Sequence, residues 1–529
     1  MIQQASFSRT SSAEPAPVPI SPPHRKFLPP SPSAALILLS AFLIGAALRL
    51  FNFTPIGWIP DTYDRISATQ TFLGHFSAPS KLYPPGPVFL LAPFFALLPD
   101  SLQTVEIVVS LSGILTILAA FILGLDLARH KGIALLYAAL IALTPDFVYS
   151  SRSTAFDNIA VFLALAILVI TPRLRQSKSV FMYTIYGILL AVLVDFRFTY
   201  AALLPGFFIY WLQPFENRVR WGQVVAAILS LPVAVSAAAF VVCMTIFALL
   251  AGSLFPGSAT GAISLERFLP NFIDYWAQML YAPIGVPLLV PFALVGFARL
   301  RRMHPSGFYF ILYVLATWPV IFSQFTFYSY RYMLLPALLL AILVAIGISY
   351  LWTIKESFTG HLPLRIFARS TSILLGIFLT SISIAMAINW PSLATESDEG
   401  LLIELRPIVS SLGEESLVVS AVSRGFYDSP GAPQSVDLID LWLDWGSGLP
   451  AQTILKSRVQ QALDNQQPVY YLYSRYEAGK DFHGHGRSHF QNFFDSVSTS
   501  FLVEEVYRTQ RKNLDSVNWI LYSVRLKAP

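Results

Sequence analysis

The sequence predicts a polytopic α-helical membrane protein with a soluble α/β domain in its C-terminal part. Of the 529 residues, 55% are hydrophobic and only 12% are charged, and the mean hydropathy is +0.60. A soluble globular chain is less apolar and carries about twice that charged fraction. The Lys and Arg residues fall in short clusters between apolar segments, which indicates membrane topology and not a nucleic-acid partner.

Composition divides the chain into three regions. Residues 1–33 are rich in Ser, Pro and Ala, which predicts a disordered cytoplasmic tail. Residues 34–390 hold the apolar segments and form the predicted transmembrane catalytic domain. Residues 391–529 are less apolar, and predicted helices alternate there with predicted strands, which indicates an external α/β domain. The strands are expected at residues 416–421, 469–473 and 519–524, and the helices at 401–412 and 452–463.

About eleven apolar segments are expected to cross the membrane. They are residues 34–51, 104–125, 133–149, 159–170, 180–194, 200–212, 224–249, 279–297, 308–321, 332–351 and 371–388. With this assignment every basic cluster, including Arg129-His130-Lys131, falls on the side of the N-terminus. Because basic loops stay in the cytoplasm, the N-terminus is expected there and the C-terminal domain outside a plasma or inner membrane.

The apolar run at residues 87–98 is too short to cross the membrane. It would span about 18 Å as a helix, whereas the hydrocarbon core is about 30 Å thick. The prolines of Tyr83-Pro84-Pro85-Gly86 keep the chain extended just before it. We therefore expect a membrane-surface helix in the first external loop, with Asp64, Tyr83, Pro84 and Pro85 positioning that loop.

Two aspartates on the predicted external face are the candidate catalytic residues. Asp61 and Asp157 each precede a predicted helix, so each also fits the role of a helix cap. Their placement on one face of the membrane favours a functional site, because capping residues need not share a side.

Four basic residues on the same face are candidates for binding a phosphate: Lys81, Arg152, Arg197 and Arg331. A guanidinium matches phosphate oxygens in a bidentate manner, although a single arginine at a helix end is also typical of an interface anchor. Histidines 483, 485 and 489 have donor atoms that suit a metal, but their Gly-rich setting is equally typical of a surface loop.

Several short motifs resemble one known superfamily. They are Asp61 after the first apolar segment, the Tyr-Pro-Pro-Gly sequence, the basic turn at Arg129, and residues 143–152 leading to Asp157. Together they resemble the GT-C superfamily of polyprenyl-phosphate-sugar-dependent glycosyltransferases, in particular lipid A aminoarabinose transferases and protein O-mannosyltransferases. The resemblance covers residues 49–212 and continues through Arg331.

The resemblance implies that a sugar moves from an isoprenoid phosphate to a hydroxyl of a lipid, glycan or protein on the external face. Asp61 matches the catalytic aspartate and is the expected general base of an inverting displacement. Asp157 is the expected positioning or metal-assisting carboxylate, and Arg197 and Arg331 are expected at the donor phosphate. A divalent cation held by Asp61 and Asp157 is an open alternative, although Thr62 follows Asp61 where many relatives have Glu, a departure that weighs against a metal role carried over from those relatives.

Two other functions also fit the sequence. Acidic residues among many membrane segments are typical of a transporter or flippase, which would need a transmembrane gradient. The Asp-Thr pair at residues 61 and 62 also leaves open an inactive relative that serves as an assembly subunit.

Overall fold

The computed structural model describes residues 32–51, 61–75, 85–98, 102–152, 156–212, 221–251, 268–281, 289–324, 330–353, 362–389, 405, 407–420, 433–438, 441, 449–473, 491–509 and 519–527. The first helices are α1 (Pro32–Leu50), α2 (Asp61–His75), α3 (Gly86–Phe95), α4 (Leu102–Ala128), α5 (Lys131–Leu143), α6 (Pro145–Arg152), α7 (Asp157–Gln176), α8 (Val180–Phe196), η1 (Phe198–Leu203) and α9 (Leu204–Leu212). They are followed by α10 (Trp221–Ile228), α11 (Leu231–Ala251), α12 (Phe268–Tyr281), α13 (Val290–Met303), α14 (Pro305–Ser323), η5 (Tyr330–Met333), α15 (Leu334–Thr353) and α16 (Leu362–Ile388). The C-terminal part contains β1 (Leu417–Ser420), β2 (Gln434–Asp437), α20 (Leu449–Asp464), β3 (Val469–Tyr473), α21 (Gln491–Ser500), β4 (Leu502–Arg508) and β5 (Ile520–Arg525).

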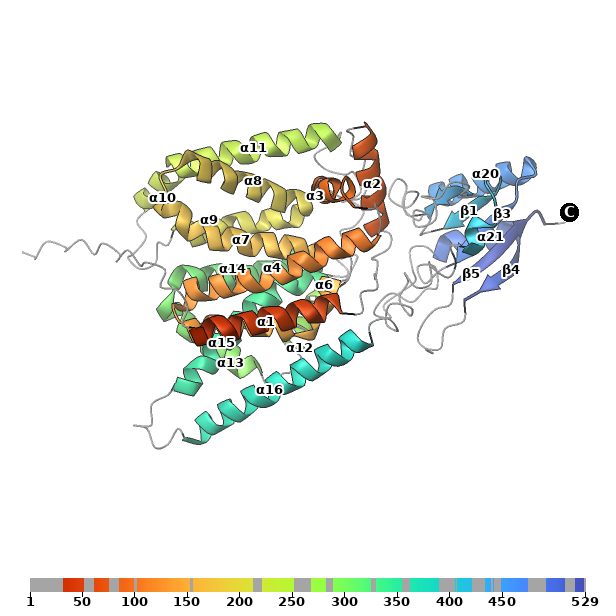
Figure 1. Cartoon of the computed structure of the whole chain (residues 1–529). Helices are drawn as coiled ribbons and strands as arrows, with labels where there is room; N and C mark the ends of the chain where they lie inside the picture. Colours follow the sequence, from red (N-terminus) through yellow and green to blue (C-terminus); the bar gives the residue numbers. More distant parts are fainter. Residues whose placement is uncertain are drawn as a thin grey trace, which may run out of the picture.

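The helices form a bundle in which most of the long axes run in similar directions (Figure 1). Among the described residues, six helices are long and apolar enough to cross a membrane, or seven if α5 and α6 form one bent span. The multi-pass helical architecture is therefore confirmed. The sequence-based number of about eleven crossings stays a prediction, since it requires the shorter α1, α8, α13 and the η1–α9 pair to cross as well.

Two predicted helices are broken in the structure, and a proline lies at each break. The expected span at residues 133–149 is bent by 55° between α5 and α6. Thr144 is extended there, because the following Pro145 disfavours a helical conformation at the residue before it. Likewise, the expected span at 224–249 is split between α10 and α11 next to Pro232. Of the expected span at 279–297, residues 279–281 end α12 and residues 290–297 begin α13, whereas residues 282–288 lie outside the described part of the chain.

Helices α2 and α3 run across the axis of the bundle at one of its ends (Figure 1). Helix α3 has 10 residues and is about 15 Å long, which is half the thickness of a hydrocarbon core. Its orientation and length agree with the membrane-surface helix that was predicted in the first external loop.

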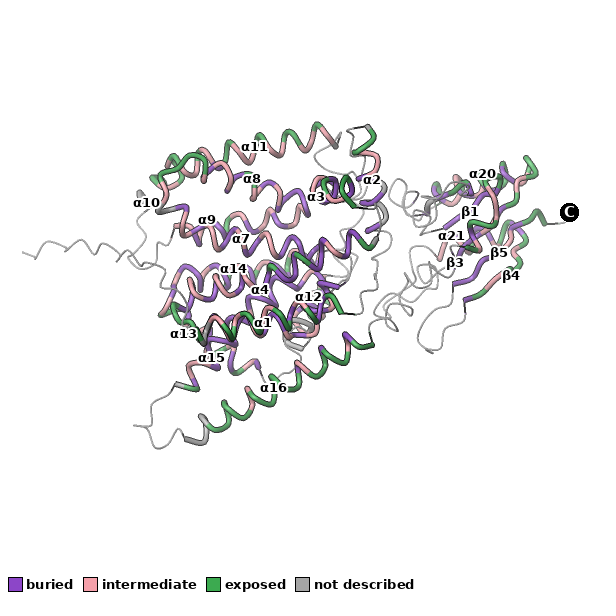
Figure 2. The backbone as a smooth tube through the Cα atoms, viewed as in Figure 1, coloured by how far each residue is buried: buried purple, intermediate pink, exposed green. Residues whose placement is uncertain are grey.

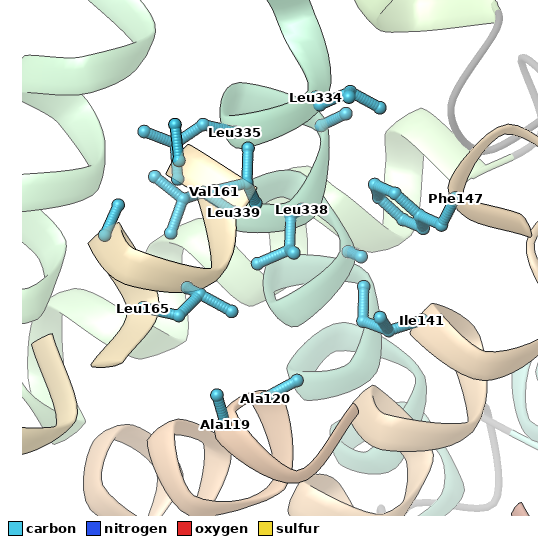
Figure 3. Packing of buried hydrophobic residues seen from close by; sticks show 14 of the residues in the cluster. Ala119, Ala120, Ile141, Phe147, Val161, Leu165, Leu334, Leu335, Leu338 and Leu339 are labelled. Carbon is cyan, nitrogen blue, oxygen red and sulfur yellow. The ribbon is translucent and has the colours of Figure 1, made fainter. Parts of the chain in front are cut away.

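The core of the bundle is built around α15. Its leucines pack against buried side chains of α4, α5, α6 and α7 (Figure 3). Helices α11 and α16, in contrast, expose most of their side chains although both are strongly apolar (Figure 2). Such helices are stable only if an apolar solvent covers them, and therefore we expect lipid against both.

Two glycines hold α13 and α15 in backbone contact. A Cβ added at Gly296 would lie 1.8 Å from the carbonyl oxygen of Leu343, and one added at Gly347 would lie 1.9 Å from that of Phe292. Each helix thus places a glycine against the backbone of the other. Small residues at a helix interface allow backbones to approach this closely in membrane proteins.

Replacing Gly296 with alanine should therefore separate α13 from α15 and destabilise the bundle by about 1–3 kcal/mol. Gly376 of α16 is the matched control, because nothing lies within 4 Å of a Cβ added there. Thermal unfolding in detergent should show a lower midpoint for Gly296→Ala and an unchanged or higher midpoint for Gly376→Ala. Equal midpoints for the two variants would contradict the backbone contact.

The C-terminal part contains one five-stranded sheet in the order β2-β1-β3-β5-β4. Strands β2, β1 and β3 are parallel, whereas β5 pairs antiparallel with both β3 and β4. One face of the sheet packs with α20 and α21 in a separate buried cluster. The predicted strands at 416–421, 469–473 and 519–524 correspond to β1, β3 and β5, whereas β2 and β4 were not predicted. Of the helix predicted at residues 401–412, only residues 405 and 407–410 are described as helical.

Candidate active site

Two arginines from distant parts of the chain converge on the carboxylate of Asp157. The Nη1 atom of Arg197 donates to Oδ1 of Asp157 at 2.7 Å, and Nε of Arg331 lies 3.4 Å from Oδ2. All three side chains are largely buried, with exposed fractions of 7% for Asp157, 16% for Arg197 and 9% for Arg331. We call these three residues the Asp157 clamp. The clamp thus joins two guanidinium groups to one carboxylate.

The ends of three helical segments bring the clamp together. Asp157 is the first residue of α7, Arg197 lies between α8 and η1, and Arg331 belongs to η5 just before α15. Phe156 occupies the N-cap position of α7, and the carboxylate of Asp157 is held by the arginines. Asp157 is therefore not the N-cap of α7 that was considered from the sequence, and its carboxylate instead binds the two arginines.

Tyr332 forms an aromatic platform for the clamp. The Arg197 guanidinium lies 4.3 Å and that of Arg331 lies 5.4 Å from the centre of its ring. The Tyr332 ring in turn stacks on Phe322 at 4.7 Å, and its backbone oxygen accepts a hydrogen bond from Trp318. Cation–π contacts on a fixed ring restrict both guanidinium groups.

A third arginine, Arg65 of α2, lies beside the clamp. Its guanidinium is 4.3 Å from the centre of the Phe156 ring, the residue directly before Asp157, and Arg65 is almost fully buried. Asp61 begins α2 four residues earlier, one helical turn away, and Asp64 lies in the same first turn. The side chains of Asp61 and Asp64 lie outside the described part of the structure. Helix α2 therefore brings the backbone of the predicted base to the end of the bundle where the clamp lies.

Arg152 lies in a different environment from the one predicted. Its Nη1 donates to the backbone oxygen of Leu48 at 2.7 Å and its Nη2 to that of Phe51 at 2.6 Å. Leu48 lies in the last turn of α1 and Phe51 directly follows that helix, where backbone oxygens lack intrahelical partners. The contact of Arg152 with a donor phosphate stays a prediction, but these bonds already give it a structural role.

Replacing Arg152 with methionine should destabilise the protein by about 2–4 kcal/mol, because two hydrogen bonds to a charged group are lost in a buried setting. Arg173→Met is the matched control, since its side chain is 38% exposed and its ion pair with Asp126 is 3.5 Å long. Exposed pairs of that kind contribute at most about 1 kcal/mol. Thermal unfolding in detergent distinguishes the two variants. An equal loss of stability in both would refute the structural role of Arg152.

The other predicted residues of the first external loop are only partly described. Pro85 is buried directly before α3. Lys81, Tyr83 and Pro84 lie outside the described residues, as do the three histidines between residues 483 and 489. The described residues contain no group of three or more His, Cys, Asp or Glu side chains that could hold a metal ion.

Three residues beside the clamp were not assigned to a site from the sequence: Arg65, Tyr332 and Asp195. The sequence feature that could have identified Arg65 as a site residue is its spacing of four residues from Asp61 on one helix. Tyr332 follows Arg331 directly, but an aromatic residue at the end of a membrane segment is usually an interface residue. Asp195 lies two residues before Arg197, but a single aspartate near the end of an apolar segment forms no motif.

Solved structures with the same fold are GT-C glycosyltransferases. The crystal structure of ArnT from Cupriavidus metallidurans in the apo state matches with a TM-score of 0.57 and 12% identity, over 93% of this chain and 98% of that one. The same protein bound to undecaprenyl phosphate matches with a TM-score of 0.55 and 12% identity, over 93% and 97%. The apo oligosaccharyltransferase from Archaeoglobus fulgidus matches with a TM-score of 0.52 and 14% identity, over 84% and 70%. No protein-family model and no curated protein matches the sequence.

The chain therefore has the fold of the GT-C superfamily, to which ArnT, a lipid A aminoarabinose transferase, and the oligosaccharyltransferase both belong. The resemblance that the short motifs predicted is confirmed at the level of the fold.

Proposed function

We propose that the protein is a glycosyltransferase that moves a sugar from a polyprenyl-phosphate carrier to a hydroxyl acceptor at the external membrane surface. The Asp157 clamp is the observation that carries this proposal. It gathers two guanidinium groups in a largely buried position, where they attract an anion more strongly than they would in water. Guanidinium groups match the oxygens of a phosphate in a bidentate manner, as they do those of a carboxylate. The binding of undecaprenyl phosphate by ArnT, which has the same fold, supports this choice.

The reaction needs a base for the acceptor proton and positive charge for the departing phosphate. We assign Asp61 as the general base that takes the proton from the acceptor hydroxyl. The oxygen of the acceptor hydroxyl then attacks the anomeric carbon while the bond from that carbon to the phosphate oxygen breaks. Arg197 and Arg331 stabilise the negative charge that develops on the phosphate. A single displacement of this kind inverts the configuration of the anomeric carbon.

Asp157 serves as a positioning residue in this scheme. Both of its carboxylate oxygens face a guanidinium group, so it orients Arg197 and Arg331. The divalent cation considered from the sequence does not fit this arrangement, because two cationic groups already occupy the carboxylate of Asp157. We therefore derive no step through a metal.

The distribution of basic residues supports an external location for the site. Helix α7 runs about 30 Å from Asp157 to its basic end, where Arg173 pairs with Asp126 of α4. Arg301 and Arg302 lie in the last turn of α13. Since basic clusters stay in the cytoplasm, we place the Arg173 end and the N-terminus there and the clamp outside.

We assign the choice of acceptor to the C-terminal region, residues 391–529. Its sheet lies near the end of the bundle that α2 and α3 cross (Figure 1). A domain at that end can lie over an acceptor as it approaches Asp61. In this proposal the C-terminal domain determines whether the acceptor is a lipid, a glycan or a protein. The donor pocket determines which sugar is transferred.

Binding of the carrier tests the proposal. Undecaprenyl phosphate should raise the unfolding temperature of the detergent-solubilised protein, whereas undecaprenol, which lacks the phosphate, should not. The rise should be lost in Arg331→Ala and kept in Arg299→Ala, because Arg299 lies over Tyr350 at the opposite end of the bundle. An equal response to both lipids would show that the phosphate is not recognised.

A further inference from the structure

Asp195 is a buried carboxylate that the proposed chemistry does not use. It is the residue before the last of α8, and its exposed fraction is 2%. Its Oδ2 atom has no hydrogen-bond partner among the described residues. A buried carboxylate is costly, and its position at the C-terminal end of α8 adds to the cost because that end of a helix carries negative partial charge. Groups outside α8 are therefore needed to stabilise a negative charge on Asp195.

The first turn of α3 lies against Asp195. A Cβ added at Gly86, the first residue of α3, would lie 2.9 Å from the carbonyl carbon and 3.0 Å from Oδ2 of Asp195. Only glycine permits so close an approach without a shift of the backbone. The N-terminus of a helix carries positive partial charge, so α3 offsets part of the cost of the buried carboxylate.

The same contact lies next to the Asp157 clamp. Asp195 is two residues before Arg197, and Arg197 binds Asp157 directly. Two aromatic contacts of α3 involve Phe89, which stacks on Phe247 of α11 at 5.1 Å and meets Phe72 of α2 edge-on at 5.2 Å. Asp195 is a polar contact between α3 and the part of the chain that carries Arg197.

We propose that Asp195 is a positioning residue that holds the N-terminus of α3 against the end of α8 and so couples α3 to the donor phosphate site. This inference rests on the proposed function. If Asp195 loses its charge, α3 should dock less firmly and Arg197 should be less well placed for the phosphate. Asp195→Asn keeps the shape of the side chain, so any effect comes from the charge. The expected effect is a rise of about tenfold in the KM for the lipid donor, with kcat changed less than about twofold.

The experiment combines hydrogen–deuterium exchange over residues 86–95 with donor kinetics in detergent. Asp195→Asn is compared with Asp126→Asn, the same substitution in a carboxylate at the opposite end of the bundle. Gly86→Ala is a second variant, which keeps the carboxylate but pushes α3 away from it. Faster exchange in α3 and a higher donor KM are expected for Asp195→Asn and Gly86→Ala, but not for Asp126→Asn.

Unchanged exchange and unchanged KM in Asp195→Asn would overturn the inference. Faster exchange with an unchanged KM would also overturn it, because α3 would then not be coupled to the donor. If the wild-type protein releases no sugar, the proposed function fails by itself, and the exchange measurement alone still shows whether Asp195 holds α3.

Discussion

Asp61→Asn should lower the rate of sugar transfer by about 10²–10⁴-fold, the contribution typical of a positioned general base. The affinity for the lipid donor should change little, because the phosphate is assigned to Arg197 and Arg331. The measurement is kcat and KM with a labelled polyprenyl-phosphate sugar. Asparagine matches the size of aspartate but cannot accept the proton from the acceptor hydroxyl.

Asp61→Ser separates catalysis from helix capping. Helix α2 begins at Asp61, and Asn and Ser both keep a side-chain oxygen there that can accept a hydrogen bond from the first turn. If Asp61 is the base, both variants lose about 10²–10⁴-fold in the rate of transfer, although their unfolding temperatures stay near that of the wild type. If capping is its only role, both should remain active, and the assignment of the base would be wrong.

Arg197→Ala and Arg331→Ala should each raise the donor KM by about 10- to 100-fold, because a hydrogen bond to a charged group is worth about 1.5–3 kcal/mol. The double variant should lose less than the sum of the two single losses, since both arginines act on one phosphate and share Asp157. Steady-state kinetics of all three variants measure this coupling. Strict additivity would show that the arginines act at separate places.

Tyr332 gives a matched pair of variants for the same clamp. Tyr332→Phe keeps the ring that lies under Arg197 and Arg331, so the donor KM should stay near the wild-type value. Tyr332→Leu removes the ring and should raise the KM in the same direction as the arginine variants. A similar KM for both variants would mean that the ring does not hold the arginines.

The sequence was sufficient to predict which residues share an end of the bundle, but not which of them touch. Asp157, Arg197 and Arg331 were placed on one face by the positive-inside pattern, which counts crossings and ignores packing. Their convergence depends on how α7, η1 and η5 pack, and no local pattern encodes that. Arg152 belongs to the same face by this count, yet its guanidinium binds backbone oxygens of α1.

The errors in the secondary structure predicted from the sequence have local causes. The bend before Pro145 was predictable, because the residue before a proline avoids the helical region. Strand β4 was not, because nearly all of its residues are exposed or partly exposed and its sequence, Leu-Val-Glu-Glu-Val-Tyr-Arg, shows no clear alternation. As an edge strand with one covered side, it lacks the buried pattern that identified β1, β3 and β5.

Release of sugar from the carrier tests the central claim most directly. The purified protein in detergent is incubated with a panel of radiolabelled polyprenyl-phosphate sugars, alongside Asp61→Asn. We expect the wild type to release sugar from at least one donor, by transfer or slow hydrolysis, and Asp61→Asn to release it at least about 100-fold more slowly. A transporter would need a gradient that detergent abolishes, and an inactive subunit would release nothing. A folded protein that binds undecaprenyl phosphate but releases sugar from none of the donors would contradict the assignment as a glycosyltransferase.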